Sequence, residues 1–61
     1  MFWAREAHGY HTTLERNAIS GMYALKVRVG ITIVCSLVFD SGREAHAAYH
    51  LSPETLLQRY T

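Results

Sequence analysis

The 61-residue sequence contains one cysteine, Cys35, and one proline, Pro53. A single cysteine cannot form an internal disulfide, which excludes a small scaffold held together by disulfides. Hydrophobic residues make up 49% of the chain, which argues against disorder. The net charge of +1 does not supply the basic field that non-specific nucleic-acid binding usually needs. The sequence therefore predicts one small globular domain over residues 1–61.

Long apolar runs are also missing. The uncharged run at residues 29–39 has only eleven members, whereas a membrane-spanning helix needs about 20. Residues 1–11 carry charges and histidines where a secretory signal has its apolar region. We therefore expect a cytoplasmic protein with no membrane partner.

A period of two dominates residues 23–39. Every odd-numbered residue there is apolar, whereas most even positions are small, polar or charged. Such alternation is typical of a strand with one buried face. A two-residue turn at Gly30 would move the buried face from odd to even positions. We therefore expect one long strand, bent near Gly30, with odd residues such as Ile31 and Ile33 in the core.

A helix is expected before this strand. Apolar residues between Trp3 and Ala18 are spaced by four, three, four and four positions, which lays one stripe along a helix. Thr12 and Glu15 match a capping box, so the better helix is predicted at about residues 13–19.

Two short helices are expected after the strand. Ser41 with Glu44 forms a second capping box, and Ser52 followed by Pro53 is a favourable helix start. The predicted fold class is therefore α+β, with an N-terminal helix, one long strand and two C-terminal helices. Because one strand cannot form a sheet, we expect antiparallel pairing with a second copy near Gly30 to complete it as a homodimer.

Four histidines are the candidate metal ligands. They occur as pairs in two similar segments, REAHGYH at residues 5–11 and REAHAAYH at residues 43–50, with spacings that a helix brings together. These residues are His8, His11, His46 and His50. No cysteine or HExxH pattern joins them, so we expect neither a metal site nor a cofactor.

The C-terminal segment, residues 43–60, reads REAHAAYHLSPETLLQRY and resembles the helix-turn-helix of bacterial DNA-binding proteins. The resemblance implies that Glu54, Thr55, Gln58 and Arg59 face bases or phosphates. The segment is also similar to the helix that follows a strand in small dimeric α+β-barrel proteins.

No nucleophile motif or glycine-rich phosphate loop is present, so we do not expect an enzyme. The leading hypothesis is a small non-enzymatic regulator or inhibitor that binds a protein partner as a homodimer. The alternative is a helix-turn-helix-like transcriptional regulator that binds DNA through residues 43–60. The residues expected to contact a protein are those that the predicted core does not require, or aromatic anchors: Lys26, Arg28, Gln58, Arg59, Phe2 and Trp3.

Overall fold

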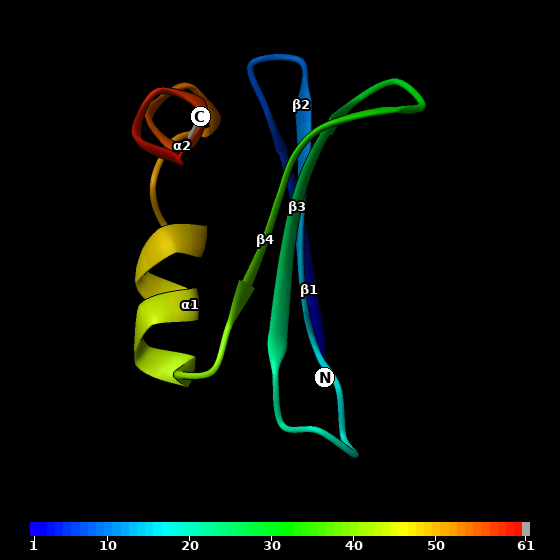
Figure 1. The fold of residues 1–61 in the computed structure, drawn as a ribbon. Helices are drawn as coiled ribbons and strands as arrows, with labels where there is room; N and C mark the ends of the chain where they lie inside the picture. Colours follow the sequence, from blue (N-terminus) through cyan, green and yellow to red (C-terminus); the bar gives the residue numbers. More distant parts are fainter. Residues whose placement is uncertain (61) are drawn as a thin grey trace.

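In the computed structural model, which describes residues 1–60, the chain forms a four-stranded antiparallel sheet followed by two helices (Figure 1). The elements are β1 (Phe2–Ala7), β2 (Tyr10–Arg16), β3 (Tyr23–Val29), β4 (Thr32–Phe39), α1 (Gly42–Tyr49) and α2 (Pro53–Tyr60). The strands lie in the sheet in their order along the chain, so each pairs only with its sequence neighbours. Both helices lie against the same face of the sheet (Figure 1), which we call the inner face. Within residues 1–60, no helix lies against the opposite, outer face.

The prediction of an N-terminal helix at residues 13–19 is wrong, because residues 2–16 form the β1–β2 hairpin. Its two-residue turn is His8–Gly9, and both residues have positive φ, 55° and 80°. That backbone conformation suits the right-handed twist of the two strands.

The turn also explains the misleading helical spacing. Ala7 pairs with Tyr10 across it, so the inner face passes from odd positions on β1 to even positions on β2. Trp3 and Ala7 are four residues apart, and Tyr10 and Leu14 are four residues apart. Two strands joined by this turn therefore reproduce the spacing of one helical stripe.

The single long strand expected at residues 23–39 is also wrong. The chain turns back at residues 30–31, where Val29 pairs with Thr32, and a bulge follows in β4. Val27 pairs with Cys35 but Arg28 pairs with Ile33, which leaves one extra residue on β4. The sheet is thus built within one chain, and the expectation that a second copy completes it is wrong.

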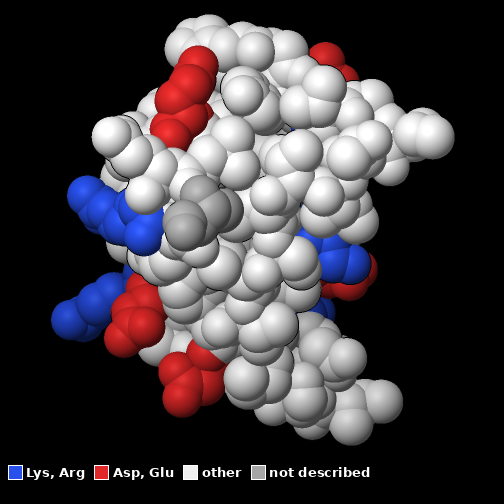
Figure 2. Space-filling model, turned by 45° about the horizontal axis from the view of Figure 1, so that its top comes forward, with Lys and Arg blue, Asp and Glu red and all other residues white. Residues whose placement is uncertain are grey.

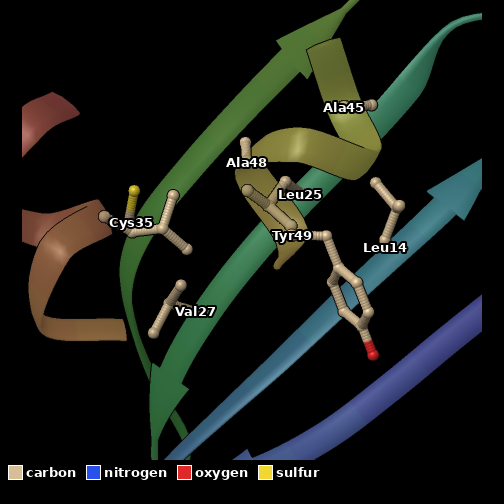
Figure 3. Close-up of a cluster of buried hydrophobic side chains, with 8 residues drawn as sticks. Leu14, Leu25, Val27, Cys35, Ala45, Ala48 and Tyr49 are labelled. Atoms are coloured by element: carbon tan, nitrogen blue, oxygen red, sulfur yellow. The ribbon is translucent and has the colours of Figure 1, made fainter. Parts of the chain in front are cut away.

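The core lies between the inner face and the helices. Leu14, Leu25, Val27 and Cys35 from three strands meet Ala45, Ala48 and Tyr49 of α1 (Figure 3), and Leu56 of α2 joins the same cluster. The two alanines leave room for α1 to approach the strands closely. Ile31 and Ile33, which were expected in this core, are 98% and 53% exposed. Ile31 belongs to the turn, and Ile33 lies beyond the bulge as the partner of Arg28 on the outer face.

Both C-terminal helices are present, and their serine caps are confirmed. The Ser41 hydroxyl accepts a hydrogen bond from the Glu44 amide at 3.4 Å. The Ser52 hydroxyl accepts from the Thr55 amide at 3.2 Å. Each serine satisfies an amide that has no partner within its helix.

A side chain from β1 fixes the connection between the helices. Arg5 Nη2 donates to the carbonyl oxygen of Leu51, and the Arg5 guanidinium lies 5.1 Å from the centre of the Tyr49 ring. The first strand is thereby tied to the end of α1. Neither helix among the described residues has the length and apolar character required to cross a membrane.

Candidate binding surfaces

The outer face carries charges of both signs on different strands. Lys26 and Arg28 are exposed on β3, and Arg28 lies opposite His11 of β2 and Ile33 of β4. His11 Nδ1 lies 3.1 Å from Glu6 Oε1 of β1. This mixture of signs is typical of a solvated sheet face.

The β3–β4 hairpin ends in an exposed apolar group that we call the apolar tip: Val29, Ile31, Ile33 and Val34. Val29 is 47% exposed and Val34 is 38% exposed, and the two isoleucines are more exposed still. In Figure 1 the hairpin bends away from the rest of the sheet at the upper right. Arg28 Nη1 donates to the Gly30 carbonyl oxygen at 2.9 Å, which links a basic side chain to the turn. An apolar group of this kind, flanked by basic side chains, is typical of a binding surface.

The residues expected to contact a protein partner do not form one surface. Lys26 and Arg28 lie together on the outer face beside the apolar tip. Gln58 and Arg59 are exposed on α2, which covers the other face. Phe2 is exposed, whereas the neighbouring Trp3 is half-buried against His46, with ring centres 4.6 Å apart.

Two of the residues expected to contact nucleic acid take part in contacts within the chain. Glu54 Oε2 lies 2.7 Å from His8 Nδ1 in the β1–β2 turn. Hydrogen bonds from its own backbone amide and from His8 lower the pKa of the Glu54 carboxyl. The Thr55 hydroxyl is 2.7 Å from the Ser52 hydroxyl at the start of α2. Gln58 and Arg59 remain exposed.

The four histidines lie in different surroundings. His8 contacts Glu54, and His11 contacts Glu6. His46 packs edge-to-face on Trp3 and Tyr23, and His50 lies against Tyr49. Within residues 1–60, no three or more side chains of His, Cys, Asp or Glu are placed to share a metal ion, and no pocket is present.

A further surface, which the sequence analysis did not identify, is the free edge of β4. This strand lies at one edge of the sheet and contains neither a charged residue nor a proline. Figure 2 shows the molecule turned from the view of Figure 1 so that its top comes forward. A broad uncharged surface runs through the middle of this view, with charged side chains toward its margins. Val34 and Val38 are exposed on this strand. Both valines occupy even positions, where most other residues between 23 and 39 are small, polar or charged. These two apolar residues were the available signal of the edge in the sequence.

Comparison with models of known protein families gave no match. Curated proteins and solved structures likewise gave no match to this chain.

Proposed function

We propose that the chain is a small non-enzymatic regulator or inhibitor that acts by binding another protein through the apolar tip. The observation that carries this proposal is the exposure of four valine and isoleucine side chains on one projecting hairpin. Ile31 is 98% exposed, so it contributes almost nothing to the core. Exposed apolar groups with polar rims are characteristic of protein interaction sites.

The surroundings of the tip define the chemistry of its partner. Lys26 and Arg28 lie in the second half of β3, the strand that leads into the turn, and both are exposed. Complementary charge at the rim of an interface accelerates association and selects among partners. The partner that fits is a protein with an apolar groove bordered by acidic side chains.

A matched pair of substitutions tests this proposal. Ile31 and Ile19 are both almost fully exposed, but Ile19 lies in the β2–β3 loop. Immobilised wild type, Ile31→Ser and Ile19→Ser are exposed to a lysate of the source cell, and captured proteins are quantified. We expect Ile19→Ser to capture a specific partner as wild type does. Ile31→Ser should bind that partner at least about tenfold more weakly, which is roughly 1.4 kcal/mol of binding free energy.

A second variant tests the contribution of the basic side chains beside the apolar tip. Lys26→Glu with Arg28→Glu is expected to weaken capture of the same partner while leaving the melting temperature within a few degrees of wild type. Equal capture by wild type and Ile31→Ser would contradict the assignment to the tip.

DNA binding through residues 43–60 is the alternative proposal. It is supported by the exposure of Gln58 and Arg59 on a helix that follows α1 after a three-residue connection. Titration of salt into a mixture of the protein and mixed-sequence duplex DNA separates the two functions. Binding that falls steeply with salt, and that Arg59→Glu abolishes, would favour the DNA-binding function.

A further inference from the structure

The two edges of the sheet differ in their protection. Edge strands present unpaired N–H and C=O groups, and charged side chains or proline commonly prevent another strand from pairing there. β1 carries Arg5 and Glu6, whereas β4 reads TIVCSLVF. The edge at β4 is therefore open to pairing in a way that the edge at β1 is not.

The apolar layer of the molecule also continues to the β4 edge. Leu25 is fully buried, but its β4 partner Leu37 is only half-buried, as is Phe39. Tyr60 of α2 packs edge-to-face on Phe39 with ring centres 6.2 Å apart and is still 41% exposed. A strand placed beside β4 would cover these side chains and extend the core.

The sequence of β4 matches its own copy. When a strand pairs antiparallel with itself about a two-fold axis through one residue, residues at equal distances on either side lie opposite each other on the same face. With the axis at Ser36, Val34 lies opposite Val38 of the second copy, and Cys35 lies opposite Leu37 of the second copy. Serine then faces serine, apolar side chains face apolar side chains, and no charge is removed from water.

We propose that two copies of this chain associate through antiparallel pairing of their β4 strands about a two-fold axis at Ser36. The two sheets become one continuous sheet, and the helices of both copies lie on the same face. The paired segment includes Val34 of the apolar tip but neither Val29 nor Ile31. The proposal is argued from the free edge of β4 and does not rest on the proposed function. Because the paired strands run in opposite directions, the two apolar tips lie at opposite ends of the dimer.

Sedimentation with one charged variant and one control tests the interface. Val38 is 64% exposed, and Val38→Lys places a charge on the paired strand. Ala4 is exposed on β1, at the opposite edge, and Ala4→Lys adds the same charge there. We expect wild type and Ala4→Lys to sediment as dimers at about 100 µM and Val38→Lys to weaken association at least about tenfold.

Disulfide trapping tests the register. Directly opposite residues of an antiparallel pair have Cα atoms about 4.5–5.5 Å apart, within the range of about 4.4–6.8 Å that a disulfide spans. Ser36→Cys should therefore form a covalent dimer under mild oxidation, visible on a non-reducing gel. Ala4→Cys and wild type, whose Cys35 is buried, should form little.

Two results would overturn the proposal. The first is a wild type that remains a folded monomer at about 100 µM. The second is cross-linking of Ser36→Cys no faster than that of Ala4→Cys, which would place the two Ser36 side chains apart.

Discussion

Thr12 is a polar residue within an apolar interior. It is fully buried on β2, opposite Val27, and its hydroxyl oxygen has no hydrogen-bond partner among the described residues. A buried hydroxyl without a partner loses its hydrogen bonds to water and forms none within the protein, which lowers the stability of the fold. Valine has nearly the same shape and removes this penalty.

We therefore expect Thr12→Val to stabilise the fold by about 1 kcal/mol. For a domain of this size, the melting temperature would rise by about 4–8 °C per kcal/mol. Thr13→Val is the control, because Thr13 is the next residue on the same strand and lies on the outer face. Thermal unfolding followed by circular dichroism measures both, and a destabilised Thr12→Val would show that the hydroxyl has a stabilising role.

Other details at the residue scale could not be predicted from the sequence. Arg5 was read as part of a histidine-containing segment, yet it bonds the Leu51 carbonyl and lies against Tyr49. His46 was considered as a metal ligand, yet it packs against Trp3. Both contacts join residues more than forty positions apart, and no local pattern encodes such pairs.

The β3–β4 hairpin shows how two local features can hide each other. A two-residue turn moves the inner face from odd to even positions, and one extra residue in a bulge moves it back. Because the turn at residues 30–31 and the bulge in β4 cancel, Tyr23 and Phe39 lie opposite each other although the odd-numbered alternation is unbroken between them. The alternation correctly predicted extended structure but could not reveal the turn. The caps of α1 and α2 were predictable because each depends on residues three positions apart.

The turn of this hairpin depends on one backbone conformation. Gly30 has φ of 59°, in the left-handed region that an L-residue with a Cβ atom occupies at a cost of about 1–2 kcal/mol. Gly30→Ala should therefore destabilise the fold by about 1 kcal/mol in urea unfolding, although nothing lies within 4 Å of the added methyl group. Ile31→Ala, at the other turn position, is expected to change stability by less than about 0.5 kcal/mol. Equal effects of the two substitutions would mean that the turn does not require its present geometry.

At the scale of the whole molecule, stability is limited by size. The Cα radius of gyration is 10.9 Å, in the range of about 10–11 Å expected for a compact chain of this length. A domain of about 60 residues buries only about 60% of the surface that its unfolded chain exposes. Burial of Leu37, Phe39 and Tyr60 in the proposed dimer would enlarge the core where it is thinnest.

Dimerisation through β4 therefore predicts a melting temperature that depends on protein concentration. Mass action stabilises a folded dimer as concentration rises, so wild type should melt a few degrees higher after each tenfold increase. The melting temperature of Val38→Lys should depend less on protein concentration over the same series, because its association is weaker. Differential scanning calorimetry between about 10 µM and 1 mM provides the measurement. If the melting temperature of wild type did not change with concentration, β4 would contribute to the monomer alone and not to a dimer.

The order of strands in the sheet has a consequence for synthesis on the ribosome. Each strand pairs with the one made just before it, so the sheet can form stepwise as the chain emerges, with only short loops to close. The helices that cover Leu14, Leu25 and Val27 come last. Until α1 and α2 are translated, a nearly finished sheet presents its apolar face to solvent or to a chaperone. We expect a chain that stops at Asp40 to aggregate or be degraded, because residues 41–60, which hold both helices, cover a sheet that is already assembled.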